Sequence, residues 1–280
     1  MMQTEKPVLS PNAGGAQHWW SLPRLGLEWL EAWHRRKAAV ERFYGHSFLC
    51  RPLSPGAAVL DVGAHAGSFG LFLREKYGCQ ITMVEPLPER LRVSDASGIR
   101  VVAAAMSAQA GPRQIFLSRN PEATSFYETI AGTYCVVGAR EVETCTLEAV
   151  LQAHCPNGAA LVKLDIEGEE VPVLLAAPPQ ALASIAQLSV EFHDFLEDRP
   201  RRAEVEMVLK RLRRLNFVQY VMSRAWGCHE DTLLINRSLV HLSVAERLHL
   251  WLLTRVTLAV QSMRRYLAIR LRQLAGRSGT

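Results

Sequence analysis

The 280-residue sequence predicts an α/β protein, in which helices cover both faces of a mostly parallel sheet. Three observations predict this class. Between Pro55 and Arg237, short apolar runs alternate with segments of helical spacing. The runs are continuously apolar, as in strands that are buried on both faces of a parallel sheet. The chain length and a hydrophobic content of 49% are sufficient for one complete α/β core.

Seven strands and five helices are expected in this region. The strands are predicted at residues 57–62, 81–85, 99–105, 160–166, 187–193, 217–222 and 232–236. The helices are predicted near residues 67–76, 88–95, 146–154, 169–176 and 201–214. A long segment with RQIFLS, an irregular PEATSFYETIAG and CVVGAREVET separates the third strand from the fourth. Ligands bind beyond the carboxyl ends of such strands. We therefore expect this long segment to form one wall of the site that binds the acceptor, the molecule on which the protein acts.

The turn after the first predicted strand suggests a nucleotide cofactor. In AAVLDVGAHAG, an apolar run ends at Asp61, and Gly63 and Gly67 open onto a helix. Glycine lets a ligand approach the backbone because it has no Cβ. These three residues alone fit equally well an ordinary turn with Asp61 as a helix-capping acid. Glu85 ends the next strand about 20 residues later, where such folds place a ribose-binding acid, and this favours the cofactor site.

The spacing favours S-adenosylmethionine over NAD. The dinucleotide fingerprint G-x-G-x-x-G is absent, and the order is D-x-G-x-x-x-G. A pyrophosphate needs a helix N-terminus without a neighbouring carboxylate, whereas the ammonium and sulfonium of S-adenosylmethionine suit an acid at Asp61. A nicotinamide-dependent oxidoreductase would share the first two strands and stays open as an alternative.

Polar residues gather at the ends of the fourth and fifth predicted strands. In VKLDIEG, Lys163, Asp165 and Glu167 alternate with apolar residues, as Glu191 and His193 do in LSVEFHD. Buried charges are costly unless they are paired or used, so this juxtaposition marks a candidate site. The alternative is a structural ion-pair network, Lys163 with Asp165 or Glu191. We favour that alternative for Lys163, and a functional role for Asp165 and His193.

Methyl transfer from S-adenosylmethionine proceeds by in-line displacement, which depends on alignment of the reacting groups, and a hydroxyl acceptor would also have to lose its proton. His193 is the predicted general base, because an imidazole titrates near neutral pH, and Glu191 or Asp165 would orient its ring. Alternatively, a divalent ion held by Asp165 with Glu167 or Glu191 would lower the hydroxyl pKa. Nothing in the spacing of these residues demands a metal, and none is predicted.

Five segments resemble, in order, the signatures of the FkbM-type S-adenosylmethionine-dependent methyltransferases. They are PLSPGAAVLDVGAHAGSFG, MVEPLPE, CTLEAVL, VKLDIEGEEVPVLLAA and LSVEFHD, within residues 50–195. The resemblance implies a Rossmann-like class I methyltransferase fold, with a seven-stranded sheet whose last strand is antiparallel. It also implies O-methylation of a hydroxyl on a sugar, polysaccharide or secondary metabolite.

The resemblance further implies roles for particular residues. Cofactor contacts are expected at Asp61, Gly63, Gly67 and Glu85. Functional roles are expected for Asp165, Glu167, Glu170 and His193. Two positions depart from the family pattern. His65 replaces a usual asparagine and alters a turn contact, and an alanine in AAAMS replaces another asparagine at the end of the third strand. The backbone from Ala105 to Ser107 is therefore expected to hold the adenine.

Two helical extensions flank the predicted methyltransferase domain of residues 51–237. Residues 1–50 hold four of the six tryptophans, and helical spacing predicts one amphipathic helix packed on the domain. Its apolar positions are Leu22, Leu25, Trp29, Trp33, Val40 and Tyr44. Tryptophan also stacks on sugars and lies at membrane interfaces, but an aromatic stripe of this kind is more often core.

Residues 238–280 are predicted to form a basic amphipathic tail. From Ser243 onward there are seven arginines and one acid, a net charge of +6, so residues 1–242 carry −1. Ser243 and Glu246 form a capping box. The predicted apolar face comprises Val244, Leu248, Trp251, Leu252, Val256, Val260, Met263, Leu267, Leu271 and Leu274. Such a helix either docks on the protein's own core, which we favour, or contacts an anionic membrane through residues 243–274.

Composition bounds the location and the partners. The most apolar stretch, residues 248–260, contains Arg255 and is shorter than the ~18 to 20 residues of a membrane span. The N-terminus lacks a signal-peptide pattern, and the six cysteines form no CxxC pair, which predicts a cytoplasmic protein, free or peripheral at the inner membrane surface. We expect a hydroxylated small molecule or glycan as acceptor, and no nucleic acid. A catalytically inactive scaffold is a further alternative, against which the polar strand ends argue.

Overall fold

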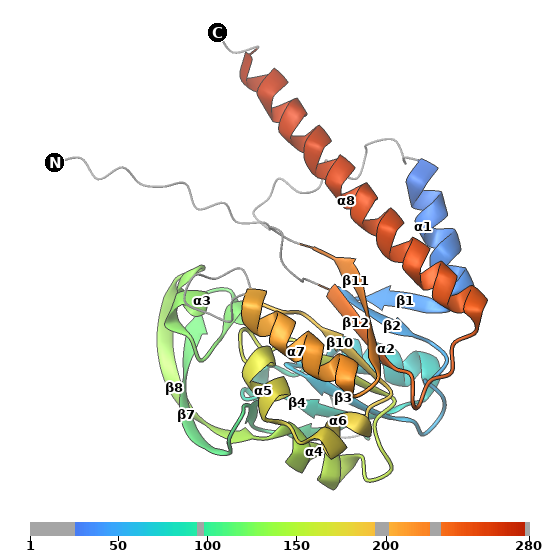
Figure 1. The fold of residues 1–280 in the computed structure, drawn as a ribbon. Helices are drawn as coiled ribbons and strands as arrows, with labels where there is room; N and C mark the ends of the chain where they lie inside the picture. The colour runs from blue at the N-terminus through green and yellow to red at the C-terminus, as the bar shows by residue number, and fades with distance from the viewer. Residues whose placement is uncertain (1–25, 94–97, 194–201, 225–230, 278–280) are drawn as a thin grey trace, which may run out of the picture.

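The computed structural model describes residues 26–93, 98–193, 202–224 and 231–277. Its central sheet has the strand order β11-β12-β10-β9-β3-β4-β5, with helices on both faces (Figure 1). Strands β10, β9, β3, β4 and β5 pair in parallel, whereas β12 is antiparallel to both β10 and β11. The predicted α/β class is confirmed, with one antiparallel strand among those described.

The strands of this sheet lie within a residue of the predicted ranges, and several are shorter. They are β3 (Ala58–Val62), β4 (Gln80–Val84), β5 (Arg100–Val102), β9 (Leu161–Leu164), β10 (Gln187–Val190), β11 (Phe217–Ser223) and β12 (Asp231–Asn236). The prediction of one strand over residues 99–105 is wrong, because the chain leaves the sheet after Val102. Asp165, Glu167, Glu191 and His193 follow the ends of β9 and β10 rather than lying within them.

The two faces of the sheet bury different helices, because side chains alternate across a strand. Leu60 and Val162 pack into the core with helices α4 to α7. These helices are α4 (Leu147–His154), α5 (Glu170–Ala176), α6 (Pro179–Ala183) and α7 (Arg202–Arg214). Val59 and Leu161 face the opposite side, against α2 (Ser68–Tyr77). The helix predicted at residues 88–95 is wrong, since a short 3₁₀ helix, η2, covers Pro88–Arg90 and residues 91–93 are not helical.

The long segment between β5 and α4 folds into a sheet of its own, at the left of Figure 1. Its strands are β6 (Ala105–Met106), β7 (Gly111–Ser118) and β8 (Val136–Cys145), in the order β6-β8-β7. Between β7 and β8 lie η4 (Pro121–Ala123) and α3 (Glu128–Gly132). Strands β7 and β8 form an antiparallel pair that the sequence analysis did not predict.

The single helix expected to reach Tyr44 ends earlier. Helix α1 covers Gly26–Lys37, and a hairpin of β1 (Val40–Phe43) and β2 (His46–Leu49) follows. Tyr44 and Gly45 both have positive φ, 48° and 89°, as a tight two-residue hairpin turn requires. Strand β2 is fully buried and packs on β10 and β12, so the hairpin shares the core of the domain. The predicted positions before residue 26, Trp19 and Trp20 among them, lie outside the described residues.

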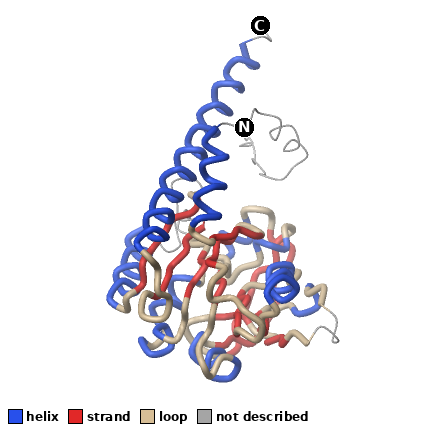
Figure 2. Tube along the Cα trace, turned by 90° about the vertical axis from the view of Figure 1, so that its right-hand side faces the viewer, coloured by secondary structure: helices blue, strands red, loops and turns tan. Residues whose placement is uncertain are grey.

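Helix α8 (Val244–Arg277) runs beside α1 and projects beyond the body of the molecule (Figures 1 and 2). The predicted capping box is confirmed, since the Glu246 N–H donates to Ser243 Oγ (3.2 Å) and the Ser243 N–H to Glu246 Oε2 (2.8 Å). Docking on the core is confirmed for Leu250, Leu253 and Val260, which are buried. The predicted apolar face is wrong at Val244, Leu248, Trp251 and Met263, which are exposed, whereas Leu252, Val256, Val260 and Leu267 are buried or half-buried. Among the described helices, none has the length and apolar content needed to cross a bilayer.

Candidate active site

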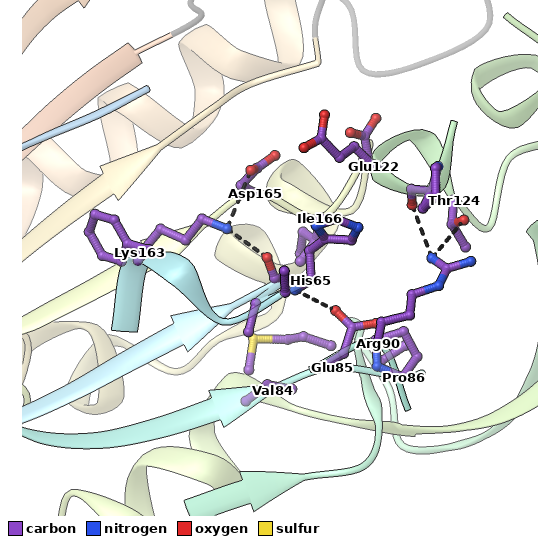
Figure 3. A pocket seen from close by; sticks show the side chains of 18 of the residues that line it. His65, Val84, Glu85, Pro86, Arg90, Glu122, Thr124, Lys163, Asp165 and Ile166 are labelled. Carbon is purple, nitrogen blue, oxygen red and sulfur yellow. Dashed lines mark hydrogen bonds and ion pairs between the residues drawn. The ribbon is translucent and has the colours of Figure 1, made fainter. Parts of the chain in front are cut away.

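A cavity opens at the carboxyl ends of β3, β4, β9 and β10, which is where ligands bind in open α/β sheets. The predicted wall from the long segment is present, because Ile115, Glu122 and Phe126 line the cavity (Figure 3). Six of the predicted site residues also line it, namely Gly63, His65, Glu85, Asp165, Glu167 and Glu191. Four others are not among the lining residues, namely Asp61, Gly67, Ser107 and His193.

The β3–α2 turn depends on Gly63. Gly63 has φ 75°, and its N–H donates to Val84 O at 3.0 Å. A Cβ at this position would lie 1.8 Å from the carbonyl oxygen of Asp165. The turn therefore brings the backbone of β3 directly against that of the β9 loop, a close approach that glycine alone permits. Gly67, with φ 80°, stands at the start of α2.

Asp61 supports this turn from behind. Its side chain is fully buried, and Oδ2 accepts a hydrogen bond from the Gly70 N–H (2.9 Å) in the first turn of α2. Its Oδ1 lies 3.7 Å from Lys163 Nζ. These contacts match the helix-capping alternative, and Asp61 is not among the residues that line the cavity.

Glu85 and His65 stand together at one end of the cavity. Glu85 accepts a hydrogen bond from the backbone N–H of His65 (2.8 Å; Figure 3) and another from that of Leu87 (3.1 Å). Burial raises the pKa of the Glu85 carboxyl, although these two donors oppose the shift. His65 has φ 49°, which is uncommon for a residue other than glycine and typical of functional sites.

Of the backbone segment predicted to hold the adenine, Ala105 to Ser107, Ser107 is not among the residues that line the cavity, and its side chain is engaged elsewhere. Its Oγ donates to Glu169 Oε2 (2.8 Å) and accepts from Arg113 Nη1 (2.6 Å). Tyr127 also donates to Glu169, at 2.5 Å. Glu169 thus ties the second sheet to the β9 loop. The cavity is lined instead by Ala105 and Met106, which precede Ser107.

The ion pair predicted for Lys163 is confirmed. Lys163 Nζ lies 3.3 Å from Asp165 Oδ2 and donates to Gly63 O at 2.7 Å (Figure 3). Burial alone would lower the pKa of Lys163, but Asp165 and Asp61 outweigh it, and the pKa is raised. Burial alone would raise the pKa of Asp165, but Lys163 and His46 hold it far below its ordinary value. Asp165 is therefore ionised at neutral pH.

His193 clamps the loop that carries the acids of LDIEGEE. Its Nδ1 lies 2.9 Å from Glu170 Oε1 and its Nε2 lies 3.3 Å from Glu167 Oε2. Glu170 also accepts from the N–H groups of Ile166 (3.0 Å) and Gly168 (3.2 Å). Glu167, at φ 52°, is held so that it lines the cavity, where burial raises the pKa of its carboxyl.

These contacts contradict the predicted role of His193 as general base. Burial alone would lower its pKa, but the Glu167 and Glu170 carboxylates raise it well above the ordinary value. The two carboxylates therefore favour the imidazolium form, which has no lone pair to accept a proton. His193 is not among the residues that line the cavity, and its contact with Glu167 fits a positioning role instead.

His46 is a site residue that sequence reasoning missed. It lines the cavity from β2, with Nε2 3.4 Å from Asp165 Oδ2 and Nδ1 3.4 Å from Ser189 Oγ. The sequence pattern predicts a helix that reaches Tyr44, and this places His46 in a connecting segment. No local pattern therefore links His46 to the ends of the predicted strands. The turn-forming Tyr44-Gly45 pair would have indicated the hairpin.

Two groups of side chains have metal-ligand spacing. They are His46, Asp165 and Glu191, and Asp165, Glu167 and His193, each with ligand atoms within 4.8 Å of one another. Lys163 already pairs with Asp165, and the His193 imidazolium pairs with Glu167. Asp165 and Glu167 therefore already have cationic partners within the chain, so neither carboxylate requires a metal to balance its charge.

Comparison with known proteins identifies the family. A chain of the complex between the Haloferax volcanii Trm112 methyltransferase activator and a methyltransferase is 12% identical, with 75% of this chain and 93% of that chain covered and a TM-score of 0.33. The antibiotic-resistance methyltransferase Kmr is 17% identical, with 66% and 88% covered and a TM-score of 0.31. Similarities this distant decide nothing about function. No curated protein matches the sequence. The model of the methyltransferase FkbM domain matches residues 61–218, more than half of the chain, and the chain therefore belongs to the FkbM methyltransferase family.

Proposed function

We propose that this protein is an S-adenosylmethionine-dependent O-methyltransferase that acts on a hydroxyl of a sugar, polysaccharide or secondary metabolite. One observation carries the proposal: a single cavity at the strand ends is lined both by Gly63 and Glu85 of the predicted cofactor site and by Asp165, Glu167 and His46. The family membership of residues 61–218 supports it. The proposal includes the class I methyltransferase fold, with which the strand order and the antiparallel β12 agree.

The lining suits the charge of the cofactor. Carboxylates outnumber the permanent cations in it, with Glu85, Glu122, Asp165, Glu167 and Glu191 against Arg90 and Lys163. S-adenosylmethionine, when bound, supplies a methyl group on a positively charged sulfur. We expect Glu85 to accept hydrogen bonds from ribose hydroxyls, and Ala105 and Met106 to contact the adenine.

Glu167 is the best-placed group to take the acceptor proton. Its raised pKa makes it a stronger base than an ordinary carboxylate, and the His193 clamp fixes its direction. The ionised Asp165 and its neighbour His46 can hold acceptor hydroxyls, because carboxylate oxygens accept and an imidazole donates or accepts hydrogen bonds. The resulting alignment of hydroxyl and methyl group is the main contribution that such a site makes.

Calorimetric titration tests the cofactor assignment. We expect S-adenosylhomocysteine to bind the protein and NADH not to bind, and Glu85→Ala to weaken S-adenosylhomocysteine binding by about tenfold or more, the loss of a charged hydrogen-bond acceptor. Glu141→Ala, an exposed carboxylate on β8, serves as the matched control. Binding of NADH alone would replace the proposal with the oxidoreductase alternative.

Labelled-methyl transfer to a panel of sugars and glycans tests the reaction. Glu167→Gln should lower kcat by about 10² to 10⁴ with little change in cofactor affinity, because a general base acts in the transition state. The acidic limb of the pH profile should also disappear in this variant. An unchanged kcat would remove Glu167 from the base role. Cofactor binding without transfer to any acceptor would favour the inactive-scaffold alternative.

A further inference from the structure

Helix α8 has two apolar sides, and the core covers one of them. Leu250, Leu253 and Val260 are at most 3% exposed against the body of the molecule. The opposite side carries a second row that we call the outer stripe: Val244, Leu248, Trp251, Tyr266 and Ile269, each between 52% and 73% exposed. Val244, Leu248 and Trp251 are four and three residues apart, Tyr266 and Ile269 are three apart, and Leu248 and Tyr266 are eighteen apart, which is five full turns. The row therefore stays on one side of a helix with 3.6 residues per turn. No described residue covers this row.

Arginines accompany the aromatic side chains of the outer stripe. The Arg255 guanidinium lies 5.4 Å from the ring centre of Trp251, and that of Arg270 lies 5.5 Å from the ring centre of Tyr266. No acidic residue follows Glu246 in the sequence. The stripe is therefore both apolar and uniformly cationic. Tryptophan, tyrosine and arginine are the side chains that favour the headgroup region of a bilayer.

We propose that the outer stripe of α8 binds the surface of an anionic lipid bilayer, with the helix lying along the surface. Its apolar side chains would enter the acyl boundary while the arginines meet lipid phosphates. Two copies joined stripe to stripe would bring arginine against arginine, which opposes self-association. A nucleic acid would leave Val244, Leu248 and Ile269 without an apolar environment. Charge and apolar pattern together fit lipid best.

The projection of α8 makes the outer stripe accessible. Both views show its C-terminal part extending away from the sheet domain (Figures 1 and 2). Tyr266 and Ile269 lie toward the C-terminal end of α8, whereas Leu248 and Trp251 neighbour Leu250 and Leu253, which pack into the core. A bilayer could therefore contact the whole row without displacing the docked side of the helix. The inference does not depend on the methyl-transfer proposal.

Co-sedimentation of the full chain with vesicles tests the inference. We expect binding to vesicles of phosphatidylcholine and phosphatidylglycerol, little to phosphatidylcholine alone, and weaker binding as salt is added. Trp251→Ala with Tyr266→Ala should lower partition by at least about tenfold, the loss of two buried aromatic side chains. Arg255→Gln with Arg270→Gln should lower it by about 25-fold, at about fivefold for each charge near an anionic surface.

Met207→Ala is the matched control, because Met207 is an equally exposed apolar residue (58%) on α7, outside the stripe. It should leave vesicle binding unchanged, and all variants should keep the thermal midpoint of the parent, since the substituted side chains are exposed. Absence of binding to the anionic vesicles would overturn the inference. So would equal binding by parent and stripe variants, RNA binding that anionic vesicles do not displace, or a dimer in light scattering that the stripe variants abolish.

Discussion

At the residue scale, Gly63 determines how closely the cofactor turn approaches the β9 loop. Gly63→Ala would place a Cβ 1.8 Å from Asp165 O and a non-glycine residue at φ 75°. We expect the free energy of unfolding to fall by about 1 to 3 kcal/mol and S-adenosylhomocysteine to bind more weakly. Urea unfolding and calorimetry measure both. Gly138→Ala, whose Cβ would have its nearest neighbour 3.9 Å away, is the control, and an equal loss there would contradict this explanation.

His193 makes a pH-dependent contribution to stability. Its folded pKa is raised well above 6.5 by Glu167 and Glu170. The stabilisation is therefore fully present below about pH 6.5, the unfolded pKa, and is lost as the pH rises through the folded pKa. We expect the difference in free energy of unfolding between the parent and His193→Gln to be largest at low pH and to shrink at alkaline pH. A difference that does not vary with pH would show that the ring is neutral. His241→Gln, at an exposed position, is the control.

The acids of LDIEGEE illustrate how much residue type alone could predict. Sequence reasoning placed Asp165, Glu167 and Glu170 at a site because charges at strand ends are costly unless used. The structure divides their roles: Asp165 and Glu167 line the cavity, Glu170 holds the loop, and Glu169 anchors the second sheet. The charges could be read from the sequence. The direction in which the Glu167 side chain points, however, depends on the positive φ of Glu167 and on its contact with His193.

At the element scale, α1 and α8 meet through two histidines. His34 Nδ1 lies 2.9 Å from His249 Nδ1, and Trp33 contacts His249 edge to face at 5.0 Å. At this distance the two nitrogens share one proton, and full protonation would place two positive charges together. Burial lowers the pKa of His34, and His249 lowers it further.

This histidine pair predicts that α1 loosens in acid. A folded pKa below 6.5 stabilises the packing above pH 6.5, and the stabilisation is lost as the pH falls through the folded pKa. We expect amide hydrogen exchange in α1, corrected for intrinsic rates, to be faster near pH 5 than near pH 7.5. His34→Gln should reduce this pH dependence. Uniform protection of α1 across the range would contradict the prediction.

Elements whose structure depends on residues close in sequence were predicted better than elements whose structure depends on contacts with distant segments. The β3–α2 turn and the capping box of α8 depend on neighbours in sequence, and both are present. The β7–β8 hairpin was missed because its strands are irregular in pattern and pair only with each other and β6. The buried side of α8 was misassigned because both of its sides are apolar, so periodicity could not select the one that docks.

At the scale of the whole molecule, segments from four strand ends line the cavity in which we propose that the cofactor binds, so binding should stabilise these segments together. At a concentration 100 times its Kd, S-adenosylhomocysteine should add about 2.7 kcal/mol to the free energy of unfolding. For a chain of this size we expect a rise of roughly 5 to 10 °C in Tm, at about 2 to 4 °C per kcal/mol. Differential scanning fluorimetry measures it. NADH should leave Tm unchanged, and Glu85→Ala should reduce the shift.

The sequence by itself determined the α/β class, most strand positions of the central sheet, the glycine turn with its two acids and the gathering of charge at neighbouring strand ends. Each of these follows from periodicity, backbone conformation or the cost of burying charge, which act over a few residues. The tertiary structure alone decided that His46 enters the cavity, that His193 becomes a clamp and that α8 exposes an apolar stripe. His46 and Asp165 are 119 positions apart, and such contacts arise from packing between elements whose relative placement no local pattern encodes.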